Sequence, residues 1–246
     1  MLKILIVDDE ISAGNILKIL IKKYIPIETE IEYCDSAQKA LDILPEFQPS
    51  LIMLDIEMPV MNGFDFLSLT AHDTLHVIFT TAFDKYAIKA IRFSALDYLL
   101  KPIDVLDLKN AINSHIVKSR NFEQKSLVDN LLTNLKQPDQ KNFKLALSTS
   151  EGTFFFDPVD ILYCEADNNY TKFNLLNKKP LLVSKTLGDF DELLSEHQFI
   201  RIHKSYLVNI KYITKVNRDG TLTMSDGKEL SISKRKKEMV MGILKK

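Results

Sequence analysis

The fold of the first half follows from an apolar run that ends in a carboxylate, Leu51-Ile52-Met53-Leu54-Asp55. The start of the chain repeats this pattern in Lys3-Ile4-Leu5-Ile6-Val7-Asp8-Asp9. Short, continuous apolar runs are typical of β-strands that helices cover on both faces. Both segments are therefore expected to be central strands with acids at their carboxyl ends.

Helical patterns alternate with the strand candidates. After Ser36, a typical N-cap residue, Ala37, Ala40 and Leu44 recur at helical spacing. Five strands that alternate with helices predict an α/β fold with a doubly wound parallel sheet. The strand candidates are Lys3–Val7, Glu30–Cys34, Leu51–Leu54, His76–Thr80 and Tyr98–Leu100, and two further helix candidates are Asp84–Phe93 and Asp104–Ser119.

In such sheets the chemistry gathers beyond the carboxyl ends of the strands. Here these ends carry three acids (Asp8, Asp9 and Asp55), a hydroxyl pair (Thr80-Thr81) and Lys101. Converging carboxylates repel one another, and a hard cation such as Mg²⁺ makes their approach tolerable. A hydroxyl and an ammonium group suit the oxygens of a phosphoryl group. Together these groups indicate formation of an aspartyl phosphate.

Four motifs resemble the receiver domain of two-component response regulators, over residues 1–120. This resemblance implies a five-stranded, flavodoxin-like α/β fold. It also implies a regulator rather than an enzyme, with phosphoryl transfer and hydrolysis only at its own aspartate. The motifs are Ile6-Val7-Asp8-Asp9-Glu10, the segment Leu54–Gly63, Thr80-Thr81-Ala82 and Asp97-Tyr98-Leu99-Leu100-Lys101-Pro102.

The resemblance assigns a role to each matching residue. Asp55 would be the phosphoacceptor, with a sensor histidine kinase as donor. Thr81 would be the switch hydroxyl, Lys101 the partner of the phosphoryl group, and Tyr98 an aromatic that changes rotamer. The Lys101-Pro102 bond is expected to be cis. The ligands of Mg²⁺ (or Mn²⁺) would be Asp8, Asp9, Asp55 and the backbone carbonyl of Glu57.

Phosphorylation adds charge and three acceptor oxygens at Asp55. Thr81 should move toward them and leave space for Tyr98, which would shift the balance between two packings. The surface that includes Ile88 and Ile91 then becomes a candidate face for a phosphorylation-dependent homodimer, although each of these isoleucines, taken alone, is better explained as core.

Residues 121–141 are interpreted as a linker, at least partly helical. The helical pattern that begins at Asp104 continues to Leu135, and the polar segment Gln137-Pro138-Asp139-Gln140-Lys141 ends it. Two alternatives stay open: one long helix, broken near 120–122, or a short helix followed by a tether.

Residues 142–246 have the pattern of a mostly antiparallel β domain. Short strand candidates follow closely, and Arg218-Asp219-Gly220 and Ser225-Asp226-Gly227 predict tight turns. One helix is expected at Thr186–Ser195, with an acidic polar face that suits DNA poorly. No helix-turn-helix or zinc spacing occurs in the sequence.

Three polar clusters stand out in this half: Asp167-Asn168-Asn169-Tyr170, Arg201-Ile202-His203-Lys204-Ser205 and Ser233-Lys234-Arg235-Lys236-Lys237. The last begins a terminal helix, with Ser233 as the expected cap. Cations at a helix N-terminus oppose the helix dipole, and bound phosphates would turn this penalty into an attraction. A solvated basic end is the alternative explanation.

The segments that carry these clusters resemble the LytTR DNA-binding domain. They are Ile161–Tyr170, Phe199–Asn209 and Leu230–Arg235. The resemblance implies a compact β fold whose loops enter the major groove, on promoter DNA with direct repeats. Lys234 occupies a position where the family commonly has Arg. The ammonium of Lys is a point charge and cannot replace the bidentate guanidinium of Arg. The DNA-binding candidates are Asn168, Asn169, Lys172, His203, Lys204, Lys234, Arg235 and Lys236. For His203 the alternative is that it only holds its loop, since a lone His is more often structural.

Two rival functions were weighed. A phosphatase that uses an aspartyl phosphate would normally have a second acid two residues after the nucleophile. That family has Asp at this position, whereas this chain has Glu57. The second rival keeps the receiver but makes the β domain a protein- or RNA-binding module. A steep salt dependence of binding would favour DNA.

Composition sets the remaining expectations. No apolar stretch reaches the roughly 18 residues of a membrane span, and acids follow too soon after Met1 for a secretory signal. Two cysteines, Cys34 and Cys164, match no metal spacing, which favours a reduced, cytoplasmic protein. Residues 1–120 hold 12 Lys and Arg against 17 Asp and Glu, whereas residues 142–246 hold 17 against 13, so the second half is mildly basic.

Overall fold

The computed structural model describes residues 1–70, 75–82, 85–94, 96–118, 124–137, 142–149, 151–217 and 219–244. Of residues 85–87, 117, 118 and 124 it describes the backbone only. The chain forms two compact units, Met1–Lys136 and Gln137–Lys246, each with its own core.

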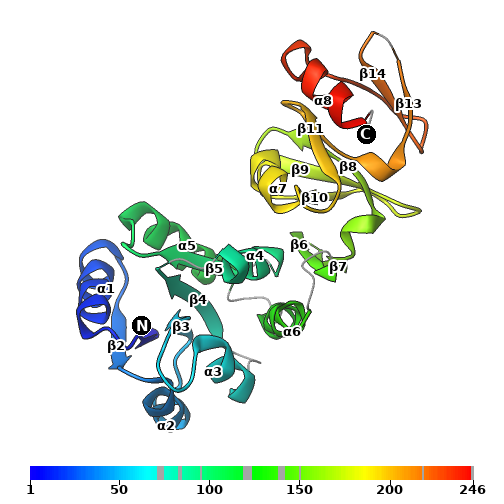
Figure 1. Ribbon diagram of the computed structural model, residues 1–246. Coiled ribbons are helices and arrows are strands. Elements are labelled where there is room, and N and C mark those ends of the chain that lie inside the picture. Colours follow the sequence, from blue (N-terminus) through cyan, green and yellow to red (C-terminus); the bar gives the residue numbers. More distant parts are fainter. Residues whose placement is uncertain are drawn as a thin grey trace. The chain divides into compact units, whose positions relative to one another are not determined.

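The first unit has an α/β fold, in which helices flank a parallel sheet (Figure 1). The strand order is β2-β1-β3-β4-β5, and every neighbouring pair is parallel. This order confirms the doubly wound fold, and it places a topological switch point between β1 and β3, where such sheets bind their ligands. The strands are β1 (Leu2–Val7), β2 (Thr29–Cys34), β3 (Leu51–Asp55), β4 (His76–Thr81) and β5 (Asp97–Leu100), and the helices are α1 (Ile11–Tyr24), α2 (Ala37–Phe47), α3 (Gly63–Leu69), α4 (Lys85–Phe93), α5 (Val105–Lys118) and α6 (Gln124–Leu135).

Helices α1 and α5 cover one face of this sheet, where Leu17 and Ile112 pack against Ile4, Ile6 and Met53 of the strands. Each such side chain contributes roughly 1.5–3 kcal/mol when fully buried. Helix α2 begins after Ser36, whose hydroxyl accepts a hydrogen bond from the backbone N–H of Lys39, as its sequence predicts.

Helix α6 belongs to the first unit, because it packs against α3 and α4. Its side chains Val128 and Leu131 are fully buried. Ser94, just after α4, accepts hydrogen bonds from the amide groups of Asn130 (3.2 Å) and Asn134 (3.4 Å). Helix α5 ends at Lys118 and α6 begins at Gln124, and the expected break near 120–122 lies outside the described residues.

The second unit is built from antiparallel strands, which confirms the expected class of this half (Figure 1). A five-stranded sheet has the order β10-β9-β8-β12-β11, a three-stranded sheet the order β13-β14-β15, and β6 pairs with β7. The strands are β6 (Leu145–Thr149), β7 (Gly152–Phe156), β8 (Ile161–Asp167), β9 (Tyr170–Leu175), β10 (Leu181–Val183), β11 (Phe199–His203), β12 (Tyr206–Asn209), β13 (Ile213–Val216), β14 (Thr221–Met224) and β15 (Glu229–Ser231). The helices are α7 (Leu187–Leu193) and α8 (Lys237–Leu244), with short 3₁₀ turns η2 (Pro158–Asp160), η3 (Ile210–Tyr212) and η4 (Lys234–Lys236).

A hydrophobic core and an aromatic contact hold this unit together. Ile202 and Val208 of the large sheet pack with Leu222 of β14 and Val240 of α8. A second contact fixes α7, since Phe190 meets Phe173 edge to face with ring centroids 4.7 Å apart.

The predicted turns in the second unit are partly described. Gly220 and Gly227 have φ angles of 97° and 84°, which glycine adopts at little cost. Arg218 lies outside the described residues. Within the described parts of the chain, none of the helices combines the length and the apolar character that crossing a membrane requires.

Candidate functional site

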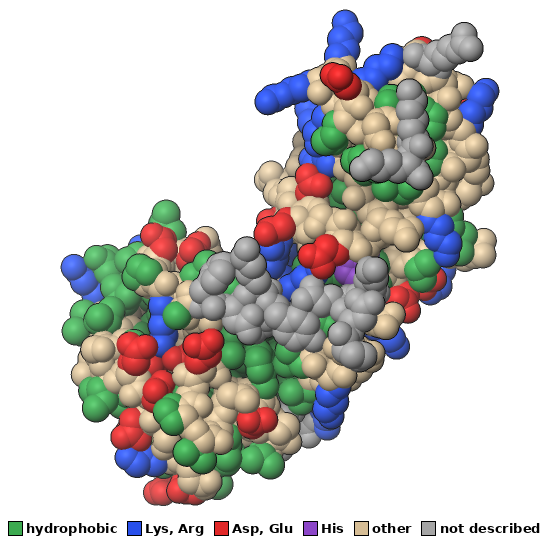
Figure 2. Space-filling model, viewed as in Figure 1, with side chains coloured by type: hydrophobic (Ala, Val, Ile, Leu, Met, Phe, Trp, Pro, Cys, Tyr) green, Lys and Arg blue, Asp and Glu red, His purple; other side chains and the backbone are tan. Residues whose placement is uncertain are grey.

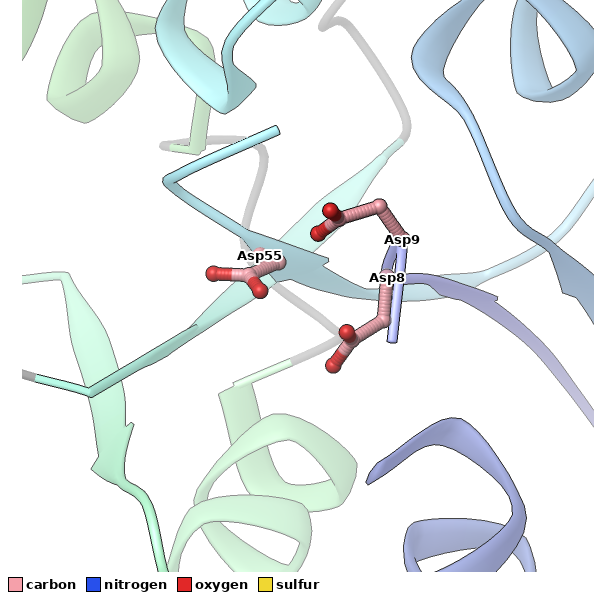
Figure 3. Close-up of side chains that lie close together, drawn as sticks. All are labelled: Asp8, Asp9 and Asp55. Atoms are coloured by element: carbon pink, nitrogen blue, oxygen red, sulfur yellow. The ribbon is translucent and has the colours of Figure 1, made fainter. Parts of the chain in front are cut away.

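Three carboxylates converge at the carboxyl edge of the parallel sheet. Strands β1 and β3 are neighbours, with Val7 opposite Leu54, so the next residues, Asp8 and Asp55, emerge side by side. One carboxylate oxygen from each of Asp8, Asp9 and Asp55 lies within 4.8 Å of the others (Figure 3). Asp8 and Asp55 are buried, whereas Asp9 is partly exposed.

Lys101 brings a positive charge to these acids from the end of β5. Its ammonium group lies 2.6 Å from Oδ2 of Asp55 and 2.9 Å from Oδ2 of Asp8. The peptide bond between Lys101 and Pro102 is cis, as expected. The N–H of Lys101 donates to the carbonyl of Thr81 (2.8 Å), which ties the end of β5 to the end of β4.

The charges of this site shift its protonation equilibria. Burial raises the pKa of the Asp8 carboxyl and the charge of Asp55 adds to the rise, while Lys101 offsets part of it. Burial acts against the ammonium of Lys101, but its hydrogen bonds to Asp55 and Asp8 outweigh this and raise its pKa. Lys101 therefore remains charged at neutral pH and offsets only part of the negative charge of three acids.

Backbone contacts orient the two buried carboxylates. The N–H of Glu10 donates to Oδ1 of Asp8 (3.0 Å), and the N–H of Glu57 donates to Oδ1 of Asp55 (3.2 Å). The Tyr33 hydroxyl donates to the carbonyl of Asp8 (2.7 Å), a contact that the sequence analysis missed because nothing in the alternation of β2 marks it.

Gly63 lies against the backbone of the site. A side chain there would collide with the carbonyl oxygen of Asp55, and the N–H of Gly63 donates to the carbonyl of Ile56 (2.9 Å). The preceding Asn62 caps α3 by accepting from the N–H groups of Phe64 and Asp65. The Asn62-Gly63 pair thus sets how closely α3 approaches Asp55.

The predicted switch residues lie on the two strands beyond β3. Thr81 is the last residue of β4; its side chain is fully buried, and its hydroxyl has no hydrogen-bond partner within the described residues. Tyr98 lies on β5 opposite Phe79 and is partly exposed. A buried hydroxyl without a partner is costly, and a new acceptor beside it would relieve that cost.

The residues present fit a hard divalent cation. All the side chains in the cluster offer carboxylate oxygens, which Mg²⁺ and Mn²⁺ prefer. Two of these carboxylates are withdrawn from water and have a single cation, Lys101, in contact among the described residues. A further positive charge would complete this arrangement.

A second set of polar residues gathers at one end of the large sheet in the second unit. The β8–β9 and β11–β12 hairpins are neighbours, because β12 pairs with β8 and the N–H of Ala166 donates to the carbonyl of Ser205 (2.9 Å). The first hairpin exposes Asn168 and Asn169 at its tip, with Asn168 in the left-handed region (φ 53°), and Lys172 farther along β9. The second exposes Lys204.

The basic segment 234–236 joins the same end of the sheet. The N–H of Ser233 donates to the carbonyl of Ile202 (3.0 Å), so η4 begins beside β11. Lys234 and Arg235 are exposed and Lys236 is partly exposed; Figure 2 shows Lys and Arg side chains projecting from the second unit, while Asp and Glu gather on the first. Ser233 is at the N-cap position as expected, but the helical segment that it precedes starts with the 3₁₀ turn η4, and the Ser233 hydroxyl makes no cap hydrogen bond.

Other residues of the second polar cluster make contacts within the protein. Nδ1 of His203 accepts from the N–H of Ser205 (3.2 Å). The Arg201 side chain donates to three backbone carbonyls, a role that the sequence, which grouped it with the exposed cations, did not reveal. Asn209 is buried at the other end of β12 and donates to the carbonyl of Ile161 (3.1 Å).

Comparisons with known proteins agree with both halves of this geometry. The family model "Response regulator receiver domain" matches residues 4–113, and "LytTr DNA-binding domain" matches residues 151–245. The sensory transduction protein LytT of Bacillus subtilis (strain 168) is 31% identical over 241 residues, 95% of each chain. The transcriptional regulatory protein BtsR of Escherichia coli (strain K12) is 27% identical over 241 residues, 96% of this chain and 95% of that one. A crystal structure of a two component transcriptional regulator AraC from Clostridium phytofermentans ISDg has 31% identity over 49% of this chain and 96% of its own, with a TM-score of 0.44.

The fold and the acidic edge define a receiver domain joined to an antiparallel β domain. The chain belongs to the family of two-component response regulators that combine a receiver domain with a LytTR DNA-binding domain. The output domain of such a regulator is its DNA-binding domain.

Proposed function

We propose that Asp55 accepts a phosphoryl group from a sensor histidine kinase, and that the phosphorylated chain regulates transcription by sequence-specific binding to promoter DNA. The observation that carries this proposal is the position of Asp55: a buried carboxylate at the end of a central strand, in contact with Lys101 and beside two further acids. Transfer to Asp55 and hydrolysis of its phosphate are the only chemistry we assign to the chain.

The receiver edge has the groups that this transfer needs. Asp8, Asp9, Asp55 and the carbonyl of Glu57 would hold Mg²⁺ or Mn²⁺, which would offset the charge that builds up as phosphate approaches a carboxylate. Lys101, already 2.6 Å from Asp55, would pair with a phosphoryl oxygen. Its contact with Asp8 would keep its ammonium at the site during the exchange.

Thr81 would carry the signal away from the site. Its buried hydroxyl would donate to a phosphoryl oxygen, which gives it the partner that it now lacks among the described residues. A movement of Thr81 would free space for Tyr98 to turn inward and would bias the packing of α4 and β5. We propose that this change favours a homodimer. Ile91 is fully buried and Ile88 partly exposed, so Ile88 is the better candidate for such a face.

The surface beside the acidic edge suits a protein donor. Helix α1 begins two residues after Asp9 and exposes Ile11, Ile16 and Ile19. A partner that delivers a phosphoryl group to Asp55 must approach this edge, and exposed apolar side chains next to it would anchor such a partner. We therefore assign this face of α1 to the kinase.

The second unit would bind DNA with the two hairpins and η4. Asn168, Asn169, Lys204 and Arg235 are our candidates for base contacts, and Lys172, Lys234 and Lys236 for phosphate contacts. His203 holds the backbone of its hairpin through Nδ1. Two adjacent hairpins and a basic turn at one end of a sheet suit successive major grooves, and the likeness to the LytTR family suggests direct repeats as targets.

We place the receiver domain at residues 1–120, the linker at 121–141 and the DNA-binding domain at 142–246. Helix α6 of the linker would then pack on the receiver. We further propose a cytoplasmic protein, since its kinase and its DNA would both be met there.

The test is phosphoryl uptake by the full-length chain from a small acyl phosphate with Mg²⁺, read as a mobility shift on a phosphate-affinity gel. Wild type should be labelled, Asp55→Asn should not, and removal of Mg²⁺ by a chelator should prevent labelling. The matched control is Asp65→Asn, an exposed carboxylate in the first turn of α3, which should be labelled like wild type. Full labelling of Asp55→Asn would refute the assignment of the phosphoacceptor.

A further inference from the structure

Arg201 on β11 connects the β11–β12 hairpin with α7. Its Nε donates to the carbonyl of His203 (2.8 Å), one terminal nitrogen donates to the carbonyl of Leu187 (3.0 Å), and the other donates to the carbonyl of Lys204. An ion pair of 3.7 Å with Asp191 adds a second contact to α7. The Arg201 side chain is only 15% exposed, so its donors face the protein.

The carbonyls that Arg201 binds belong to an irregular part of the hairpin. The pairing between β11 and β12 shifts at this point, since Arg201 lies opposite Leu207 whereas His203 lies opposite Tyr206. Such a bulge redirects the side chains that follow it and leaves backbone groups outside the ladder. Arg201 binds two carbonyls of this segment, those of His203 and Lys204, and so holds the bulge in one conformation.

Only arginine fits this role. Its planar guanidinium carries five donors on three nitrogens in a fixed fork, whereas the three donors of a lysine ammonium share one nitrogen and cannot reproduce the separate contacts with His203, Leu187 and Lys204. The charge of Arg201 is also already engaged by Asp191 and by carbonyl dipoles. A DNA phosphate would have to displace these contacts.

We infer that Arg201 is a positioning residue for DNA recognition: it fixes the β11–β12 hairpin so that Lys204 faces the DNA, and it makes no DNA contact itself. The inference rests on the proposed placement of DNA at this hairpin. A basic residue in a DNA-binding domain would ordinarily be counted among the exposed cations that contact DNA. The inference gives Arg201 a different role.

The experiment measures DNA binding by full-length wild type, Arg201→Lys, Lys204→Ala and the double variant. The probe is a fluorescent duplex that wild type selects from a random-sequence pool, and anisotropy is recorded over a series of KCl concentrations. Lys172→Gln is the control for a phosphate contact, and it should make the dependence of log Kd on log salt shallower by about one.

Arg201→Lys keeps the positive charge and should nevertheless weaken binding by roughly tenfold, about the effect of losing one contact to a base, with an unchanged salt slope. Its effect should also depend on Lys204: in the Lys204→Ala background Arg201→Lys should cost much less, because the side chain that it positions is absent. Amide hydrogen exchange of residues 203–206 should become faster in Arg201→Lys, while that of β8 and β9 stays as in wild type.

Several outcomes would overturn the inference. Arg201→Ala is a second variant, which removes the charge. If the dependence of log Kd on log salt becomes shallower by about one in this variant, Arg201 is a phosphate contact. Additive effects of Arg201→Lys and Lys204→Ala would deny the coupling. Wild-type DNA affinity of Arg201→Lys would also overturn the inference. The same holds if the loss of affinity is explained by the unfolded fraction of this variant, as judged by circular dichroism. If Lys204→Ala and Arg235→Ala also bind like wild type, the proposed placement of DNA fails instead.

Discussion

The two candidate functional sites of this protein, the receiver edge and the polar end of the large antiparallel sheet, differ in how their side chains are held. At the receiver edge, Asp8 and Asp55 are buried and Lys101 lies within 2.9 Å of both, so charges are packed together away from water. At the other edge, Asn168, Asn169 and Lys204 are exposed, and backbone contacts hold the loops that carry them. A site for covalent chemistry needs fixed charges in a low dielectric, whereas a DNA-binding surface needs accessible side chains on a firm frame.

The largest effect is expected from removing charge at the receiver edge. Asp8→Asn together with Asp9→Asn should weaken Mg²⁺ binding by roughly 100-fold or more, because two of the three carboxylates proposed as ligands lose their charge. Calorimetric titration with Mg²⁺ measures it, and Asp42→Asn, an exposed acid on α2, is the control. Undiminished Mg²⁺ binding by the double variant would mean that the cation is held elsewhere.

A buried histidine should make the stability of the receiver sensitive to acid. Burial lowers the pKa of His115 to about 4, and the nearby His76 contributes. Protonation therefore favours the unfolded state, so the stabilisation is complete above the ordinary value of about 6.5 and is lost as the pH falls from there toward about 4.

Between pH 7 and 4.5, protonation of His115 should lower the free energy of unfolding of the receiver by roughly 2–3 kcal/mol. In His115→Leu the decrease between these pH values should be smaller by that amount. Hydrogen exchange of the α5 amides at the two pH values measures the change in free energy. His203→Gln, in the other unit, serves as the control and should leave this profile unchanged. An equal loss of stability in wild type and His115→Leu would assign the acid sensitivity to other groups.

Gly63→Ala should destabilise the receiver by about 1–3 kcal/mol, since the added methyl group collides with the carbonyl of Asp55. Gly242→Ala on α8 is the matched change in the other unit, where a Cβ meets open space, and it should stabilise its helix by about 0.5–1 kcal/mol. Urea unfolding followed by hydrogen exchange separates the two units. A neutral Gly63→Ala would show that α3 can move away from the site without cost.

Modest effects are expected for single side chains at the proposed DNA edge, where each side chain contributes separately. Arg235→Ala should weaken DNA binding by roughly tenfold and relax selectivity at one base position. Lys236→Gln should weaken binding to all sequences alike and make the salt slope shallower by about one. Anisotropy with matched and mutated duplexes distinguishes the two. Equal loss on both duplexes for Arg235→Ala would make it a phosphate contact.

Sequence patterns predict the receiver edge well because it depends on where strands end. Asp55 and Thr81 are the last residues of β3 and β4, Asp8 and Lys101 directly follow β1 and β5, and adjacent parallel strands bring their carboxyl ends together. Such patterns do not predict the hydrogen bonds around these residues. The hydroxyl of Tyr33 reaches the carbonyl of Asp8 across strands, a contact that depends on tertiary packing.

The second edge is harder to predict because a side chain there can face the solvent or its own backbone. Arg201 and Lys204 occur in the same basic cluster, yet one donates to three carbonyls and the other is exposed. A shift in pairing between β11 and β12, which no residue type marks, decides between them. Helix α6 is similar: its pattern predicts a helix, but its packing on α4 through Ser94 depends on the folded receiver.

The most direct test of the central claim, that phosphorylation of Asp55 controls DNA binding by the second unit, is anisotropy of the full-length chain on its selected duplex, with and without Mg²⁺ and a small acyl phosphate, across a salt series. The account predicts that the phosphodonor tightens binding by wild type, that binding weakens steeply with salt, and that Asp55→Asn does not respond to the donor. Equal affinities of wild type with and without the donor, under conditions where a phosphate-affinity gel shows Asp55 to be labelled, would contradict it.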